Sequence, residues 1–472
     1  MAEHTVEKIG GTTMSRSNEL IDTLFKRGGP GADLYQRVFV VSAYGGITDL
    51  LLENKKSGSP GVYAQFAAED SSMGWSNALN TVANAMCEAH GRLLDDPGDQ
   101  RAADEFVRDR IEGARSFLID LQRLCSYGHF RLNQHMMTIR ELLSGLGEAH
   151  SAHVTVLMLA RHGINARLID LTGWRDESQP ALATRLDDAF ADVDLAREMP
   201  VVTGYAQCRE GLMREYDRGY SEVTFAHLAA RTAAREAVIH KEFHLSSADP
   251  RLVGEDCVVK IGHTNYDMAD QLSNLGMEAI HPSAAKILRQ AEIPLRIVNA
   301  FDPGDPGTLI DSDTSGPPRV EMVTGLPILA LQVFEQDMVG VKGYDAAILK
   351  ALTRHDVWIV SKSSNANTIT HYVNGTLKAM QRVEKEILTS YPAAEIEMRK
   401  VALVSAVGSN MSGLQVPRRG LNALAEAGID PIAVQDTGRH VDVQFIVDSE
   451  QMAEAVKALH AALVEQDAIA AR

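Results

Sequence analysis

Hydrophobic positions follow two different periods along this chain, and the change of period marks the expected elements. A short, partly apolar stretch at residues 5–9 reads as a strand, and a continuous apolar run typical of a buried parallel strand occurs at residues 38–41. Similar runs follow in "INARLIDL", "MPVVTGY", "EAVIHKEF" and "IPLRIVNAF". Helical spacing separates them, as at Leu20, Ile21 and Leu24. This alternation predicts an α/β domain built on a parallel-rich sheet.

Between the second and third of these strands the pattern is almost entirely helical. The spacing of apolar residues predicts helices over 78–94, 103–124 and 136–160. The stretch "GRLLDDPGDQRAADEF" places a Pro-Gly turn between the first two, which predicts a helical hairpin. We interpret the hairpin as an insertion that packs on the sheet or on another subunit.

The segment 302–319 is rich in Pro, Gly, Asp and Ser, which is typical of a domain boundary. After it, "ILALQVFE" leads through a helical stretch to "WIVSKSS", and "VALVSAVG" leads through another to "PIAVQDTGRHVDVQFIV". Each stretch reads as strand, glycine-containing loop, helix and strand. The pattern predicts two small α+β units of similar plan.

Composition narrows the class of protein. The 472 residues are 45% hydrophobic, enough for several cores, and the net charge of -17 without a dense Lys/Arg run disfavours binding to nucleic acid or anionic lipid. The four cysteines are far apart and form no CxxC pair, which predicts reduced thiols. With no leader-like start and no apolar run of about 20 residues, we expect a soluble cytoplasmic protein.

Two glycine-rich loops follow the first two predicted strands. "KIGGTT" begins at Lys8, and "SAYGGIT" runs from Ser42 to Thr48. Glycines allow backbone amides to approach an anion closely, and the carboxyl ends of parallel strands meet at one edge of a sheet. The two loops together indicate a phosphate-binding site, although the spacing of their glycines and lysine is not that of a Walker A loop. Two tight strand-to-helix turns are the alternative.

A third candidate stretch is "EYDRGYSEVTFAHLAAR". Ser221 is placed to cap a helix whose first turn contains Glu222, an ordinary helix start. Capping does not explain Arg218 beside Gly219. A guanidinium at a helix start is suited to binding a carboxylate or a phosphate.

Together these motifs resemble those of a known family. "KIGGTTM", "VVSAYGGITDLLLE", "SGLGEAHSA", "DRGYSEVTFAHLA", "SADPRLV" and "IHPSAA" occur in the order seen in aspartate kinases of the amino acid kinase superfamily. The resemblance covers nearly the whole chain. It implies an amino acid kinase fold over 1–310, a parallel-rich sheet between helices with a helical insertion at about 60–131. Two α+β ACT-like domains over 320–392 and 398–466 would follow.

The resemblance also implies a reaction and a site. Aspartate kinases transfer the γ-phosphoryl group of ATP to the side-chain carboxylate of L-aspartate, giving 4-phospho-L-aspartate. Lys8 and Glu222 match catalytic positions, Lys8 also contacting phosphate and Glu222 orienting Lys8. The other matches are Thr48, Glu148, Arg218 and Ser221 for aspartate, and Gly10, Gly11, Thr12, Ser42, Gly45, Asp249 and Arg251 for ATP.

The resemblance further implies that Mg²⁺ arrives with ATP and has no protein ligands, and that no cofactor is tightly bound. We therefore interpret the 16 histidines, including His150 and His153, as ordinary core or surface residues.

Four positions depart from the family pattern. Glu222 stands for the usual Asp, His240-Lys241 for a Thr-Asp pair, Ser246 for a Tyr and Glu278 for a Lys. These exchanges and the helical insertion resemble the specialised aspartate kinases encoded with ectoine synthesis genes. Two other functions stay open: a regulatory amino-acid-binding subunit whose kinase site has decayed, and a kinase acting on glutamate, N-acetylglutamate or uridylate.

The ACT resemblance implies assembly and regulation. ACT domains pair side by side, so a homodimer or larger assembly is expected. If they act as in relatives, lysine or threonine would bind near Ser409, Asn410 and Met411 and inhibit the kinase. A dimerisation module without an effector is the alternative.

Overall fold

The computed structural model describes residues 3–26, 34–55, 57–68, 72–216, 219–275 and 280–466. It divides into two compact units, which are described separately. Unit 1 comprises Met1–His244 with Ile280–Ser312, and unit 2 comprises Leu245–Ala279 with Asp313–Arg472. Among the described residues, no helix combines the length and the apolar character needed to cross a membrane.

Unit 1 is built on a twisted sheet whose strands are mostly parallel. In chain order the strands are β1 (Thr5–Ile9), β2 (Arg37–Val41), β3 (Ala166–Ile169), β4 (Met199–Thr203), β5 (Glu236–Lys241), β7 (Leu295–Asn299) and β8 (Thr308–Asp311). Within the unit their order across the sheet is β3-β4-β2-β1-β5-β7-β8. Only the β7–β8 pair among them is antiparallel. The predicted parallel-rich sheet is confirmed, and β1 and β2 lie side by side at its centre.

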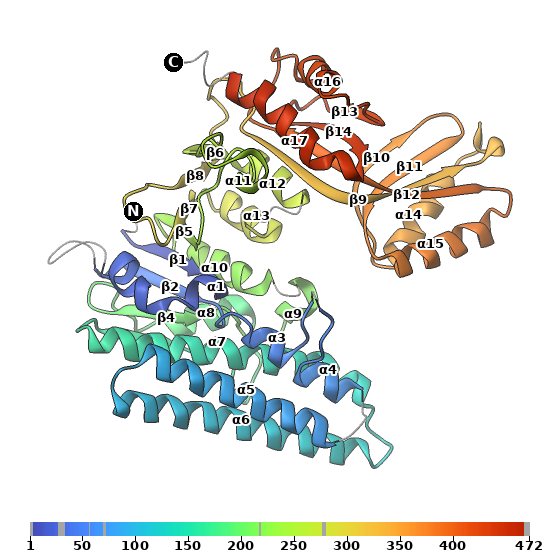
Figure 1. Cartoon of the computed structure of the whole chain (residues 1–472). Helices are drawn as coiled ribbons and strands as arrows, with labels where there is room; N and C mark the ends of the chain where they lie inside the picture. Colours follow the sequence, from blue (N-terminus) through green and yellow to red (C-terminus); the bar gives the residue numbers. More distant parts are fainter. Residues whose placement is uncertain are drawn as a thin grey trace. The chain divides into compact units, whose positions relative to one another are not determined.

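The long helices form layers below this sheet. Helix α7 (Met136–Arg161) packs on β3 and β4, and the hairpin of α5 (Ser72–Leu93) and α6 (Pro97–Cys125) packs on α7 (Figure 1). Asp96 caps α6 by accepting from the amides of Gly98 and Asp99, which explains the sharp turn predicted there. The hairpin is therefore a packed layer of this unit.

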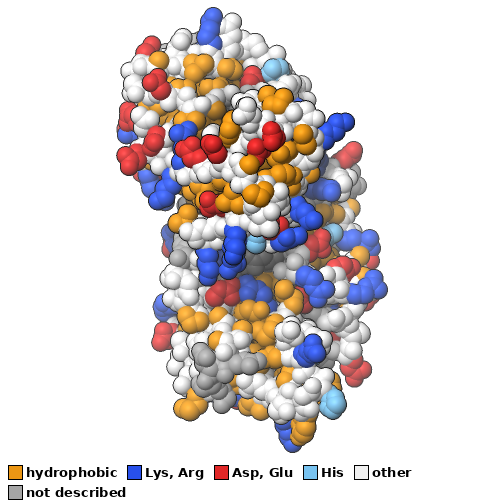
Figure 2. All heavy atoms as spheres, turned by 90° about the vertical axis from the view of Figure 1, so that its right-hand side faces the viewer, with side chains coloured by type: hydrophobic (Ala, Val, Ile, Leu, Met, Phe, Trp, Pro, Cys, Tyr) orange, Lys and Arg blue, Asp and Glu red, His pale blue; other side chains and the backbone are white. Residues whose placement is uncertain are grey.

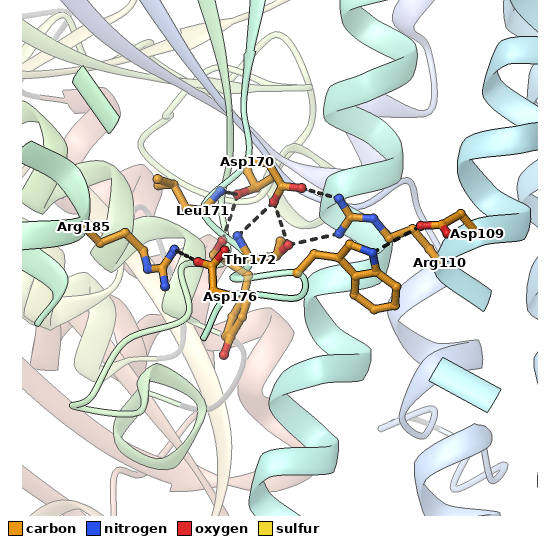
Figure 3. Close-up of polar contacts among 10 residues, drawn as sticks. Asp109, Arg110, Asp170, Leu171, Thr172, Asp176 and Arg185 are labelled. Atoms are coloured by element: carbon orange, nitrogen blue, oxygen red, sulfur yellow. Dashed lines mark hydrogen bonds and ion pairs between the residues drawn. The ribbon is translucent and has the colours of Figure 1, made fainter. Parts of the chain in front are cut away.

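A polar network joins the hairpin to the loop after β3. Arg110 of α6 pairs with Asp170 and donates to Thr172 Oγ1 at 3.2 Å (Figure 3). Asp170 in turn accepts from the Thr172 amide at 2.9 Å. The guanidinium of Arg110 also lies over the Trp174 ring, 4.8 Å from its centroid. Because Arg110 is buried, these contacts satisfy a charge that would otherwise be costly to bury.

Shorter helices complete unit 1. They are α1 (Gly11–Met14), α2 (Ser17–Leu20), α3 (Ile47–Leu51), α4 (Val62–Ala67), α8 (Leu182–Phe190), α9 (Leu212–Tyr216), α10 (Tyr220–Arg231) and α13 (Pro282–Gln290), with a π-helical turn at Ile21–Phe25 and a 3₁₀ turn at Leu132–Gln134. Helices α10 and α13 pack against each other. The helical spacing noted at Leu20, Ile21 and Leu24 thus corresponds to α2 followed by the π-helical turn.

Unit 2 contains one antiparallel sheet of six strands. Its order is β10 (Trp358–Ser364), β11 (Thr368–Asn374), β9 (Met322–Phe334), β12 (Glu395–Val407), β14 (Asp442–Asp448) and β13 (Ala433–Asp436). Strands β9 and β12 pair along their whole length of 13 residues. β11 pairs only with residues 329–334 of β9, and β14 only with residues 401–407 of β12. The two α+β lobes predicted from sequence are present, and they share β9 and β12.

Helices cover both faces of this sheet. The first lobe carries α14 (Tyr344–Arg354) and α15 (Leu377–Ser390), and the second carries α16 (Val416–Glu426) and α17 (Met452–His460). The other face packs on α12 (Tyr266–Asn274), which explains why residues 245–279 group with this unit. The remaining elements of the unit are α11 (Pro250–Val253), β6 (His263–Asn265), 3₁₀ turns at Gln336–Met338 and Ser449–Gln451, and a π-helical turn at Ala461–Glu465.

Candidate active site

The two glycine loops lie against each other at the carboxyl ends of β1 and β2. A Cβ atom built on Gly11 would lie only 2.5 Å from the carbonyl oxygen of Ala43. The Gly45 amide donates to Ser15 Oγ at 2.9 Å. Only glycine at position 11 allows this approach, so the backbones of both loops form one edge of the site.

Lys8 points to this edge and is held by Glu222. Lys8 Nζ donates to Glu222 Oε1 at 3.1 Å, and the other carboxylate oxygen accepts from the His281 amide at 2.5 Å. Burial would raise the pKa of Glu222, but the charges of Lys8 and Lys241 and the His281 amide bring it below its usual value. Glu222 is therefore ionised at neutral pH and fixes the position of the Lys8 ammonium.

Glu148 is a second buried carboxyl group near Lys8. It lies on α7, is 2% exposed, and accepts from Ser221 Oγ at 2.7 Å and from the Tyr205 amide. Burial raises the pKa of Glu148 to about 8, although the two hydrogen bonds and the Lys8 charge oppose the shift. The site thus holds one carboxylate that is ionised at pH 7 and one that is largely protonated until a cation approaches.

Small residues make room for Glu148. A Cβ on Gly204, directly after β4, would lie 2.8 Å from Ser221 Cβ and 3.0 Å from Glu148 Oε2. At the preceding position of α7, a Cβ on Gly147 would lie 2.9 Å from Ala43 Cβ. The glycines therefore let α7 bring Glu148 close to both the second glycine loop and α10.

Other predicted residues of the site occupy the same sheet edge. Ser42 is half-buried directly after β2, and its carbonyl oxygen accepts from Ser151 Oγ at 2.9 Å. Thr48 is half-buried in α3, whereas Thr12 is exposed. Gly10 is open enough that a Cβ there would come no closer than 4.0 Å to Lys8 Nζ. These positions place the hydroxyls of Thr12, Ser42 and Thr48 on the two glycine loops and on the helices that follow them.

Four residues named from the sequence lie either outside the described residues or in unit 2. Arg218 and Glu278 lie outside the described residues. Asp249 caps α11 in unit 2 by accepting from the Arg251 amide at 2.9 Å. The contribution of Asp249 and Arg251 to the ATP site stays a prediction.

The predicted capping role of Ser221 is wrong. Helix α10 begins at Tyr220 with Gly219 as its N-cap, and Ser221 instead donates to Glu148. Sequence reasoning also missed the amides of Tyr205 and His281, which bind the two carboxylates. Tyr205 follows the apolar run of β4, and His281 lies in the "IHPSAA" motif. The sequence therefore pointed to both segments, but it did not show that their backbone amides bind the carboxylates.

His240, one of the departures from the family pattern, has a structural partner. It is 3% exposed, and its Nε2 lies 2.7 Å from Glu7 Oε2. Arg37 binds the same carboxylate at 2.7 and 2.9 Å. Burial opposes ionisation, but Arg37 and His240 hold the pKa of Glu7 well below its usual value. The exchange at 240 therefore belongs to a buried ion network that joins β1, β2 and β5.

The residues proposed for an effector lie in the second lobe of unit 2. Ser409 Oγ donates to Glu321 Oε1 at 2.5 Å and accepts from Asn265 Nδ2 at 3.1 Å. Asn410 is exposed with a positive φ of 47°, and Met411 is buried in the core of this lobe. Of the three, Asn410 has the side chain most open to a ligand.

Comparisons with known proteins place the chain in a family. The amino acid kinase family matches residues 3–299, and an ACT domain matches residues 404–463. Aspartate kinase Ask_Ect of Stutzerimonas stutzeri is 51% identical over 466 residues, which cover 98% of each chain. The chain belongs to the aspartate kinases of the amino acid kinase family.

More distant relatives of this aspartate kinase are similar to it over most of the chain. The aspartokinase of Geobacillus stearothermophilus is 26% identical over 354 residues, covering 71% of this chain and 84% of the relative. Among solved structures, Escherichia coli aspartokinase III in complex with lysine and aspartate superposes with a TM-score of 0.73 at 18% identity. That match covers 98% of this chain and 100% of the other. The predicted fold, a kinase domain followed by ACT-type lobes, is confirmed.

Proposed function

We propose that this aspartate kinase transfers the γ-phosphoryl group of ATP to the side-chain carboxylate of L-aspartate. A carboxylate oxygen attacks the γ-phosphorus, the bond to the β,γ-bridging oxygen breaks, and ADP and 4-phospho-L-aspartate leave. The observation that carries the proposal is the position of Lys8, fixed by Glu222 beside two glycine loops and near Glu148.

Each part of the site has a separate task in this reaction. Lys8 compensates negative charge on the transferred group, while the loop amides and hydroxyls position the phosphates that ATP brings with Mg²⁺. Glu148 binds the ammonium group of aspartate. The acceptor carboxylate is ionised near pH 7, so the reaction requires no general base.

The intact Lys8–Glu222 and Glu148–Ser221 contacts favour an active kinase over a decayed regulatory subunit. The identity to an aspartate kinase across almost the whole chain favours aspartate over glutamate, N-acetylglutamate or uridylate. The experiment is a hydroxylamine-trapping assay with ATP, Mg²⁺ and each acceptor. Formation of aspartyl hydroxamate alone supports the proposal. Binding of an amino acid by folded protein without hydroxamate would support the regulatory subunit instead.

Lys8→Ala is expected to lower kcat by at least about a hundredfold, because the transferred charge loses a preorganised cation. Lys26→Ala is the matched control, since Lys26 is a surface lysine paired with Asp22 in the same N-terminal region. It should retain wild-type kcat. Circular dichroism would show that both variants are folded. Wild-type kcat in folded Lys8→Ala would remove Lys8 from the mechanism.

The proposal extends to the metabolic pathway that uses the product and to the assembly of the protein. The 51% identity to Ask_Ect supports a kinase dedicated to one product, which we infer to be ectoine, made through aspartate semialdehyde. The ACT-type lobes support a homodimer or larger assembly, which we infer to be cytoplasmic. Adding lysine or threonine to the same assay tests regulation. Insensitivity would fit a dedicated kinase, and strong inhibition would indicate a general supply of amino acids.

A further inference from the structure

Three side chains that commonly bind metal converge between α5 and α6, outside the active site. Cys87 and His90 lie three residues apart on α5, and Asp104 faces them from α6. Cys87 Sγ, His90 Nδ1 and a carboxylate oxygen of Asp104 all lie within 4.8 Å of one another. We propose that this cluster binds one divalent transition-metal ion of the zinc type per chain.

The donor set determines the class of ion. A thiolate, an imidazole nitrogen and a carboxylate oxygen together suit Zn²⁺ or Co²⁺ and disfavour Mg²⁺, which takes oxygen ligands. Three protein ligands leave a fourth tetrahedral position for water. Cys87 is half-buried and the side chain of Asp104 is 39% exposed, so an ion can enter from solvent.

The cluster needs only a small adjustment to hold an ion. His90 Nδ1 now lies 2.7 Å from Asp104 Oδ1. Two ligands at about 2.0 Å from a tetrahedral ion are about 3.3 Å apart, so these atoms must separate by about 0.6 Å. The Asp104 side chain is 39% exposed, so its rotation can supply this separation.

The buried side chain of His150 contacts the ring nitrogen of His90 that does not face the cluster. His90 Nε2 lies 2.8 Å from His150 Nε2, and both rings are 1% exposed. An ion on Nδ1 fixes the proton of His90 on Nε2, where it donates to His150 Nε2, and a second hydrogen bond of this kind orients a metal-bound histidine. The His150 ring packs edge-on against Tyr44, with the ring centroids 5.3 Å apart. The ion would therefore link α5 and α6 and, through His150, support the second glycine loop.

A second cluster offers a natural comparison. His244 lies 3.0 Å from Asp302 and 3.6 Å from Asp305, and their ligand atoms are also within 4.8 Å of one another. This second cluster contains no sulfur ligand, and an ordinary His–Asp ion pair explains its contacts equally well. The thiol at Cys87 thus distinguishes the proposed site chemically from this one.

Cobalt titration of the reduced, metal-free full chain tests the proposal. We expect one equivalent of Co²⁺ to give tetrahedral visible bands and a near-ultraviolet thiolate-to-cobalt band. Cys87→Ser should abolish the thiolate band, and Asp104→Asn should weaken binding by at least about tenfold. Cys125→Ser, at the end of α6, is the matched control and should retain the complete spectrum.

Alkylation gives a second readout that does not depend on colour. Zn²⁺ should protect Cys87 from iodoacetamide while leaving the half-buried Cys125 and Cys257 as reactive as before. A cobalt spectrum without the thiolate band would overturn the proposal, as would a band that persists in Cys87→Ser. Equal protection of all three cysteines by Zn²⁺ would also overturn it.

Discussion

The two buried glutamates near Lys8 show how environment assigns different protonation states to the same side chain. Glu222 touches an ammonium group and an amide and is ionised, whereas Glu148 has a hydroxyl and an amide and has a pKa of about 8. A buried carboxyl group of this kind becomes a good ligand only when a cation replaces its proton. The ammonium group of aspartate is such a cation.

The raised pKa of Glu148 predicts a pH-dependent affinity for aspartate. If the ammonium group binds only the ionised form, KM for aspartate should rise as pH falls below 8, approaching about tenfold per pH unit. KM for ATP should change much less. Initial rates of ADP release between pH 6 and 9 measure both constants.

Glu148→Gln is the control, because it does not titrate. Its KM for aspartate should be high and nearly independent of pH. Stability gives a second check: the folded wild type binds one more proton than the unfolded chain between the usual glutamate pKa and about 8, so its stability falls as pH rises. The Tm of Glu148→Gln relative to wild type should therefore increase from pH 5 to pH 8. Parallel pH profiles for both substrates would contradict the assignment.

At the scale of elements, the contact between the two glycine loops depends on one missing Cβ. Gly11→Ala places a Cβ within 2.5 Å of the Ala43 carbonyl, which forces the loops apart. We expect a loss of about 1–3 kcal/mol in stability and a large fall in kcat. Gly10→Ala is the matched variant, since nothing lies closer than 4.0 Å to its Cβ. Melting curves should separate the two variants, and equal Tm values would contradict the steric argument.

Sequence patterns predicted the buried stretches of the strands and missed stretches that are exposed or that contain glycine and proline. β2 contains the continuous apolar run at 38–41, and β1 is only partly apolar although all of it is buried; both were found. The first half of β12, residues 395–400, is largely exposed and polar, so only its buried second half was recognised. The first half of β9 contains Gly325 and Pro327, which usually argue against a strand.

In the candidate site, the sequence predicted side chains that belong to motifs and missed backbone groups. Lys8, Glu148 and Glu222 belong to recognisable motifs, and the structure brings all three together. The Tyr205 and His281 amides could not be predicted, because every residue except proline carries an amide and only the fold selects which ones converge.

At the scale of the whole molecule, acidic and basic side chains are interspersed on the face shown in Figure 2, and neither sign covers it alone. With a net charge of -17, this surface agrees with the predicted small-molecule substrates. Long-range electrostatic attraction of polyanions is not expected from it.

The shared strands predict that the two ACT-type lobes unfold together. Val333→Ala removes buried methyl groups from the first-lobe core and should cost about 2 kcal/mol. Since β9 continues into the second lobe, amide exchange should accelerate about 30-fold in β14 as well as in β11. Leu377→Ala is the control, because Leu377 is 62% exposed. Unchanged exchange in β14 would show that the lobes open independently.

The common strands also limit how such a protein can be rearranged during evolution or in the laboratory. β9 and β12 each supply one half to either lobe, so no single cut in the chain releases a complete lobe. A gene fusion that exchanged one lobe for another would leave unpaired strand edges, which favour aggregation. We therefore expect the two lobes to be exchanged only together, and a new ligand preference in either lobe to arise by substitution within it.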